Sequence, residues 1–424
     1  MTRDADEYND SYKIDIRLED DGLRRYFENG LSALLADEHF LLLYVPENGG
    51  RMQVIQPANN SYHRKRMIKM ANEAKGIPSF YYALSHLWGL TKENRYHWND
   101  VSEYVDDEEG QPVKPVSMRP EKRDALLALL KAHPGSYWWI DVLCARTDTP
   151  LDIMGDIYAC CLECIAMIDC TPSLIQEIHE MSEVVDEIEE LCRIININRG
   201  DDDPEVKHPS YQQLDQTQLP KLVERLQTLF QSRWWQRVWT WQELALPVGC
   251  VRFIAEADTW GHQTKNTITV YDLLEFGEMF SYLRYAVPFL VRSVDISLSG
   301  INEARKSNSS RDFPINPGGN FVAFFALMQS LISSKRRCYD PADYVYGVLG
   351  VMQIKIPRMA DPNAVWRHLL SKLDDLYPLA GSMKWIHCAD EIDLRKVEAI
   401  GDVYTKLFSI YAESMRRVKA LYSD

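Results

Sequence analysis

Between residues 80 and 254, short apolar runs alternate with amphipathic segments, and this alternation constrains the fold more than any other feature. Four runs have the length and the β-branched or aromatic content of strands; they are residues 80–84, 137–142, 164–168 and 250–254. Three segments between them carry apolar residues at helical spacing; they are residues 120–133, 153–163 and 220–230. Strands separated by helices are typical of a parallel, doubly wound sheet, so the sequence predicts an α/β fold.

The sequence on either side of this region has a different pattern. Residues 266–424 contain helical patterns, few β-branched runs and a polar linker at 297–320, which indicates an all-α C-terminal domain. We interpret residues 1–75 as an N-terminal extension that packs on the core. The α/β domain itself is then expected at residues 76–265.

The charge of the chain is acidic and unevenly distributed. Its 424 residues include 62 Asp or Glu against 47 Lys or Arg, a formal net charge of −15. A nucleic-acid-binding protein needs a basic surface, so this balance argues against that class. Residues 176–220 hold twelve acidic and three basic residues and thus carry −9 of the charge. We expect this stretch to be a solvated insertion in the α/β domain.

The sequence also indicates the compartment. No apolar run approaches the roughly 20 residues that span a bilayer, and the acidic N-terminus does not resemble a signal peptide. The nine cysteines lack the spacing of a disulfide framework, which favours free thiols in a reducing compartment. We therefore expect a cytoplasmic protein that does not bind membranes.

Polar and aromatic side chains follow two of the predicted strands. Ser85 and Trp88 lie where the first strand ends, and Asp141 lies near the carboxyl end of the second. The carboxyl ends of strands in an open α/β sheet border the usual ligand crevice, so these residues are candidates for ligand contacts. The alternatives are that Trp88 only packs the strand end and that Asp141 only caps the following loop.

The segment 232–246 is rich in tryptophan and is predicted to form one helix, with Ser232 as its N-cap. On that helix, Trp235, Trp239 and Glu243 recur every four residues and share one face. Desolvation beside the indole rings is expected to raise the pKa of Glu243, and the rings offer flat walls for a planar ligand.

Two plainer interpretations of this segment remain open. An aromatic stripe on a helix is more often part of a core than of a binding site. Glu243 would then form an ion pair with a neighbouring arginine, either Arg233 or Arg237.

The cysteines give weaker signals. Cys161 and Cys164 form a single Cys-x-x-Cys pair beside Cys160 and Cys170, with no second pair and no nearby histidine to complete a zinc site. We predict no metal and no cofactor. Cys144 as the nucleophile of a hydrolase would need a basic partner, and a buried thiol is the favoured interpretation.

Five segments, in order along the chain, resemble motifs of the fungal heterokaryon incompatibility (HET) domain. ALSHLWG at 83–89 is similar to the family's ALSYxWG, WIDVLC at 139–144 to WIDxLCINQ, and MGDIY at 154–158 to MxxIY. RVWTWQE at 237–243 is similar to RxWxxQE, and residues 338–350 resemble the downstream segment C.DPRDKVYALLGL.

The chain departs from this pattern at three places. His86 stands where the family usually has an aromatic residue. The Ile-Asn-Gln that follows the family's Cys is replaced by Ala-Arg-Thr at 145–147. Met-Ile-Asp at 167–169 replaces the usual apolar-x-Leu-Gly.

HET domains in turn resemble TIR domains, and that resemblance implies a chemistry. TIR enzymes carry a catalytic glutamate in an SxWCxxEL helix, which residues 232–244 resemble. The resemblance implies a flavodoxin-like parallel sheet and makes Glu243 the catalytic carboxylate of an enzyme that cleaves NAD, which is a substrate and not a cofactor. The residues that would bind the substrate are Ser85, His86, Trp88, Asp141, Arg237 and Trp239.

The same resemblance implies partners. The chain would act in cell death, self-associate to complete its site, and respond to a partner incompatibility protein, with the C-terminal helices regulating assembly. The alternative is a death-signalling interaction module without chemistry, in which the tryptophan-rich segment is only core.

Overall fold

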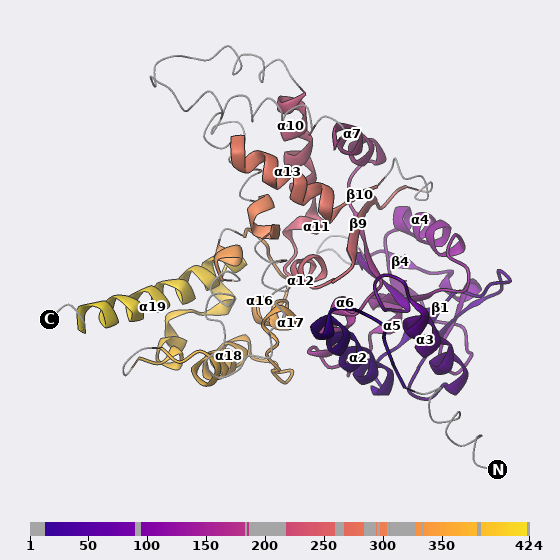
Figure 1. Ribbon diagram of the computed structural model, residues 1–424, viewed down its shortest axis with the longest axis horizontal. Helices are drawn as coiled ribbons and strands as arrows, with labels where there is room; N and C mark the ends of the chain where they lie inside the picture. Colours follow the sequence, from indigo (N-terminus) through magenta and orange to yellow (C-terminus); the bar gives the residue numbers. More distant parts are fainter. Residues whose placement is uncertain are drawn as a thin grey trace.

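The computed structural model describes residues 13–89, 95–182, 218–258, 267–283, 328–379 except 333, and 383–421, together with positions 185, 294, 297–302 and 305. Most of the acidic stretch 176–220 and of the predicted polar linker 297–320 lies outside the described residues, so the expectations for those parts remain predictions. Positions 297–302, at the start of the predicted linker, are helical instead. Figure 1 shows how the described elements are arranged.

Eight strands of the described chain form one mixed sheet in the order β10-β9-β8-β3-β7-β1-β2-β5. The strands are β1 (Leu42–Tyr44), β2 (Met52–Ile55), β3 (Tyr81–His86), β5 (Val105–Asp106), β7 (Tyr137–Ile140), β8 (Glu163–Ile168), β9 (Cys250–Ala255) and β10 (Ile268–Thr269). Two further short strands, β4 (His97–Trp98) and β6 (Val116–Ser117), pair with each other.

The centre of the sheet is parallel and doubly wound. Strands β9, β8, β3 and β7 are adjacent and parallel, with Leu84 opposite Ile140 and Ser85 opposite Ala166. In chain order these four strands lie as fourth, third, first and second, which is the order of flavodoxin-like sheets. The predicted α/β fold with a parallel core is therefore confirmed.

The edges of the sheet differ from the prediction of a parallel sheet. Strand β1 pairs antiparallel with β7 and with β2, and β10 pairs antiparallel with β9. Strands β1 and β2 come from the N-terminal 75 residues, which thus supply two strands of the central sheet. These strands are too short to give a clear alternating pattern in the sequence.

The central strands and helices match the predicted ranges with small shifts. Helix α4 (Pro120–Lys131) follows β3, and α6 (Ile153–Ala159) follows β7. The predicted strand 137–142 is two residues too long, because Asp141 already begins the short helix α5 (Asp141–Cys144). Helix α6 ends before residue 163, which begins β8. Helices α7 (Pro172–Ser182) and α10 (Leu219–Phe230) lie between β8 and β9.

The prediction of one helix over 232–246 is wrong. The segment forms two short helices, α11 (Arg233–Gln236) and α12 (Thr240–Ala245), and Arg237 between them is extended. Arg237 forms a bridge with Arg337, a residue 100 positions later in the chain. Ser232 does not cap α11; the carboxylate of Asp169 accepts hydrogen bonds from the backbone N–H groups of Arg233 and Trp234 instead.

The C-terminal region is helical, as predicted, apart from the short β10. Its longer helices are α13 (Val270–Leu283), α18 (Pro362–Leu376) and α19 (Ile400–Leu421), and α19 extends away from the sheet (Figure 1). Two short helices, α16 (Asp343–Tyr346) and α17 (Leu349–Met352), lie against the α/β core. A Cβ on Gly155 of α6 would lie 2.6 Å from the Cα of Gly350, so α6 and α17 are in backbone contact.

Within the described residues, none of the helices combines the length and the apolar character needed to cross a bilayer.

Candidate functional site

The candidate site is built around the carboxyl end of β3. The chain leaves β3 toward β7 on one side and later returns to β8 on the other, so β3 and β8 flank the switch point of the sheet. Successive side chains of a strand point to opposite faces. Ser85 accordingly meets Glu243 of α12 on one face, and His86 meets Lys122 of α4 on the other.

On the first face, a buried carboxyl group is held by a hydroxyl. The Ser85 Oγ donates a hydrogen bond to Glu243 Oε2, and the Trp234 Nε1 donates one to Ser85 Oγ over 2.8 Å. Glu243 is only 6% exposed. Burial raises the pKa of Glu243 to about 7, although the charge of Arg237 and the hydrogen bond from Ser85 act in the opposite direction.

The predicted aromatic face beside Glu243 is not formed, because the break between α11 and α12 changes the helical spacing. Trp235 is buried against Phe253 of β9. Trp239 is only partly buried and hydrogen-bonds the carboxyl of Asp343 in α16. Trp239 therefore faces the C-terminal region rather than sharing a wall with Glu243.

The alternative in which Glu243 pairs with an adjacent arginine does not hold either. Arg233 pairs with Asp169 over 3.0 Å, and Arg237 Nη1 donates to the backbone oxygen of His86 over 3.0 Å. No ion pair within 4.0 Å joins Glu243 to any other residue in the described part of the chain. Arg237 still acts on Glu243 through its charge, at longer range.

On the other face, Asp141 is an ionised carboxylate with three donors. His86 Nε2 lies 2.8 Å from Asp141 Oδ1, Trp88 Nε1 donates to Oδ2 over 2.5 Å, and the backbone N–H of Val142 donates to Oδ1 over 2.7 Å. Burial opposes ionisation of Asp141, but His86 and the hydrogen bonds from His86 and Trp88 prevail and lower its pKa. Trp88 is 43% exposed, so this side of the site borders solvent.

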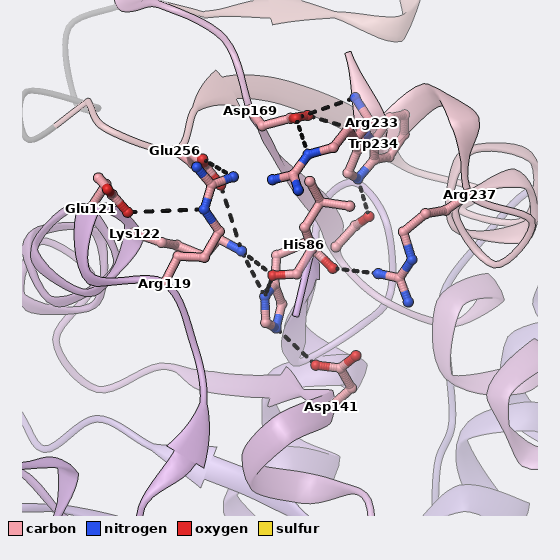
Figure 2. A network of polar contacts seen from close by, with 12 residues as sticks. His86, Arg119, Glu121, Lys122, Asp141, Asp169, Arg233, Trp234, Arg237 and Glu256 are labelled. Carbon is pink, nitrogen blue, oxygen red and sulfur yellow. Dashed lines mark hydrogen bonds and ion pairs between the residues drawn. The ribbon is translucent and has the colours of Figure 1, made fainter. Parts of the chain in front are cut away.

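Behind His86 lies a buried ionic network, which Figure 2 shows. Lys122 is fully buried; its Nζ lies 3.1 Å from His86 Nδ1 and also donates to the backbone oxygen of Leu87. Lys122 Nζ lies 3.7 Å from Glu256, and Glu256 pairs with Arg119 over 2.6 Å. Burial lowers the pKa of Lys122 to about 8, and the charge of Glu256 counteracts part of that effect.

This network defines the state of the imidazole. Burial and the charge of Lys122 lower the pKa of His86, so its ring is neutral near pH 7. The neutral ring donates from Nε2 to Asp141 and accepts at Nδ1 from Lys122. Because the His86 side chain is fully buried, we infer that it orients Asp141 and does not itself touch a ligand.

Sequence reasoning missed Lys122, although a signal was present. Lys122 precedes Ala125 and Leu126 by three and four positions, so it lies on the apolar face of the predicted helix 120–133. A lysine on such a face is buried only when it is paired. Its partners, His86 at the end of β3 and Glu256 just after β9, lie far away in the sequence and could not be identified from it.

The structure brings six of the seven predicted site residues into one group around the carboxyl end of β3. These residues are Ser85, His86, Trp88, Asp141, Arg237 and Glu243. Arg237 connects the two faces, because its charge favours ionisation of both Asp141 and Glu243. Trp239 is the exception described above.

Cys144 is a poor candidate nucleophile. Its thiol is fully buried and hydrogen-bonds the backbone oxygen of Trp138 over 3.7 Å. Burial raises the pKa of Cys144 to about 12, whereas the thiolate is the reactive form. The hydrolase based on Cys144 is therefore disfavoured.

The fold and this arrangement define a doubly wound α/β protein with two carboxyl groups at the switch point of its sheet. The family model described as heterokaryon incompatibility protein (HET) matches residues 81–243. Residues 81–243 thus carry a HET domain, as the sequence motifs predicted, and the six grouped site residues all lie within the matched range. Comparisons with curated proteins and with solved structures give no match.

Proposed function

We propose that this chain is a cell-death effector of heterokaryon incompatibility that hydrolyses the nicotinamide–ribose bond of NAD when it self-associates. The HET domain supports the role in incompatibility or cell death. The observation that best supports the chemistry is the pair of carboxyl groups at the switch point. The pKa of Glu243 is raised and that of Asp141 is lowered, and carboxyl groups with displaced pKa values cluster at functional sites.

The proposed reaction needs a carboxylate near the ribose. The bond between the anomeric carbon and the nicotinamide nitrogen breaks with its electron pair going to nicotinamide, which leaves neutral. Water adds its oxygen to the anomeric carbon and loses a proton to solvent, giving ADP-ribose. The transition state resembles an oxocarbenium ion, so an ionised Glu243 would stabilise its positive charge.

The other residues would bind the rest of the dinucleotide. Trp88 is exposed and offers an indole surface for nicotinamide or adenine, and Asp141 would accept hydrogen bonds from a ribose hydroxyl. Arg237 would bind the diphosphate through charge-assisted hydrogen bonds. Trp239 would serve as a second stacking surface only if its hydrogen bond to Asp343 opens.

Access to Glu243 requires a rearrangement, because Ser85 and Glu243 are buried. Within the described residues, three buried donors of the surrounding helices have no hydrogen-bond partner: the indole N–H groups of Trp235 and Trp241 and the amide of Gln242. Each unpaired buried donor costs roughly 1–3 kcal/mol, so the closed arrangement is not strongly favoured. We propose that self-association moves α11 and α12 and opens the site.

The same burial favours the second candidate function, an interaction module without catalysis. If Glu243 never becomes accessible to a ligand, its carboxyl group would serve only the packing of α12 against β3. The two functions differ in whether NAD is consumed.

The test is release of nicotinamide from NAD by the purified full chain over a range of protein concentrations, including crowding conditions. Wild type, Glu243→Gln and Glu163→Gln are compared; Glu163 is a buried glutamate at the amino end of β8, where it pairs with Arg252. We expect release by wild type and Glu163→Gln that rises steeply with concentration, and a loss of at least about 100-fold in Glu243→Gln.

Two results would contradict the proposal. Equal release by wild type and Glu243→Gln would show that another carboxylate acts. No release by any protein at any concentration would favour the interaction module.

A further inference from the structure

The corner between α11 and α12 is held by a segment outside the family match. Arg337 lies opposite Arg237, its backbone N–H donates to the oxygen of Gln236 over 2.5 Å, and its own oxygen accepts from the N–H of Val238 over 3.1 Å. This pairing fixes the extended backbone that ends α11. It thereby sets the direction in which α12 starts and the position of Glu243.

The preceding residue, Arg336, inserts its side chain into this corner. It is 5% exposed, and its Nη1 donates to the backbone oxygen of Arg237 over 2.8 Å and to the hydroxyl of Thr240. Thr240 in turn donates to the backbone oxygen of Trp234 over 2.7 Å. One guanidinium group therefore joins the end of α11 to the start of α12.

The guanidinium of Arg336 also lies among three indole rings. Its carbon is 5.3 Å from the ring centroid of Trp241, 5.8 Å from that of Trp235 and 6.0 Å from that of Trp234. These distances allow cation–π attraction. Because Trp234 donates to Ser85, and Ser85 donates to Glu243, Arg336 supports the group of side chains that holds the Glu243 carboxyl.

Arg336 acts on Glu243 through its charge as well. In the described part of the chain no ion pair within 4.0 Å involves Arg336, so a buried cation lies near a buried carboxyl group without contacting it. The charge of Arg336 favours ionisation of Glu243, and that of Glu243 favours the protonated guanidinium.

We propose that Arg336 is a positioning residue of the Glu243 site, which is therefore built from the HET domain and the C-terminal region together. Arg336 fixes the α11–α12 corner through its hydrogen bonds and promotes ionisation of Glu243 through its charge. Residues 81–243 alone would lack this support. The consequence for turnover rests on the proposed function, but the consequence for the ionisation of Glu243 does not.

The test measures the ionisation of Glu243 without an activity assay. Melting temperatures are recorded from pH 4 to pH 9 for wild type, Glu243→Gln, Arg336→Met and the double variant. The difference in melting temperature between each protein and its Glu243→Gln counterpart reports the ionisation of Glu243. This difference grows with pH until Glu243 is ionised in the folded state, and it is constant above that pH. The charged and titratable groups that act on Glu243 besides Arg336 are Asp141, Tyr158, Cys164 and Arg237.

We expect the difference to level off near pH 7 in the wild-type pair and roughly one pH unit higher in the Arg336→Met pair. Arg336→Lys keeps the cation, so the melting-temperature difference should level off at the same pH as in the wild-type pair. Lys335→Met, which removes an exposed cation next to Arg336, should leave it unchanged. Levelling at the same pH with and without Arg336 would overturn the proposal.

Turnover supplies a second readout. If the proposed function holds, Arg336→Met shifts the pH dependence of nicotinamide release in the same direction, and Arg336→Lys reverses the shift. If wild type releases no nicotinamide, the melting experiment still decides the role of Arg336. Should Arg336→Met fail to fold, Arg336→Gln replaces it, because glutamine removes the charge and keeps a hydrogen-bond donor: levelling roughly one pH unit above the wild-type value supports the role of the charge, and levelling near pH 7 overturns it.

Discussion

The two faces of β3 carry carboxyl groups whose pKa values are displaced in opposite directions. On one face, the buried Glu243 accepts a hydrogen bond from Ser85, which Trp234 holds in turn, and burial raises the pKa of Glu243 to about 7. On the other, Asp141 borders solvent, accepts hydrogen bonds from His86 and Trp88, and has a lowered pKa. The enclosing partners and their charges, and not the carboxyl group itself, decide which state is stable at neutral pH.

This difference follows from adjacent residues of one strand. Ser85 and His86 point to opposite faces, so one meets the tryptophan-rich α11–α12 corner and the other meets α4 and its buried Lys122. His86 is neutral and accepts from Lys122 at Nδ1, so its Nε2 can only donate to Asp141. Glu243, in contrast, receives a single hydrogen bond, from the Ser85 hydroxyl. Removing the charge from each carboxyl group should therefore affect stability with opposite signs.

The largest expected effect is that of Glu243→Gln. The folded-state pKa of Glu243 is raised from 4.5 to about 7, so wild type loses stability as pH rises through that window. Relative to pH 4, the variant should gain about 3 kcal/mol over wild type at pH 8. Urea denaturation at both pH values measures the gain. A pH-independent difference would mean that Glu243 titrates normally.

Asp141→Asn should act in the opposite direction. The substitution removes a charged acceptor from His86 and Trp88, at an expected cost of about 2 kcal/mol at pH 7. Because the folded-state pKa of Asp141 is lowered, this contribution is present above pH 3.8 and is lost as pH falls through the folded-state pKa. Urea denaturation measures it, with the exposed Asp375→Asn as control. A gain in stability would contradict the assignment of Asp141 as the ionised partner.

Ser85→Ala should change the free energy of unfolding less than the two preceding substitutions do. The indole N–H of Trp234 loses its acceptor, and Glu243 loses a donor. We expect a loss of about 1 kcal/mol in the free energy of unfolding at pH 7, while Ser409→Ala on the exposed face of α19 should change it by less than about 0.5 kcal/mol. Equal effects of the two substitutions would show that the Ser85 hydroxyl contributes nothing.

The smallest expected effect is that of Trp88→Phe. The ring remains, but Asp141 loses the donor Nε1 at a partly exposed position. We expect a loss of about 0.5 kcal/mol, measured by thermal denaturation. A loss above about 2 kcal/mol would mean that the indole is a packing element and that this face is not open to a ligand.

Much of the core and of the site could be predicted from the sequence because the signals are local. The apolar runs that end in Leu84 and Ile140 indicate two strands, and the residues that follow these runs lie at one edge of a parallel sheet. The break inside 232–246 could not be predicted, because it depends on the backbone of Arg337, far along the chain. The capping role predicted for Ser232 is taken by Asp169, another residue that is distant in the sequence.

The parts of the site that sequence reasoning missed depend on pairing between distant segments. Lys122 was visible on an apolar face, but its partners on β3 and after β9 were not. The role of Arg336 depends on the position of the C-terminal region against α11 and α12.

The most direct test of the account is the pH dependence of nicotinamide release from NAD by the assembled wild-type chain. If Glu243 is the carboxylate that acts on the ribose, the rate should rise with pH through about 7, as its folded-state pKa requires, and remain constant above that. A rate that is constant from pH 5 to pH 8, or that falls as pH rises through 7, would show that Glu243 does not act as the ionised group.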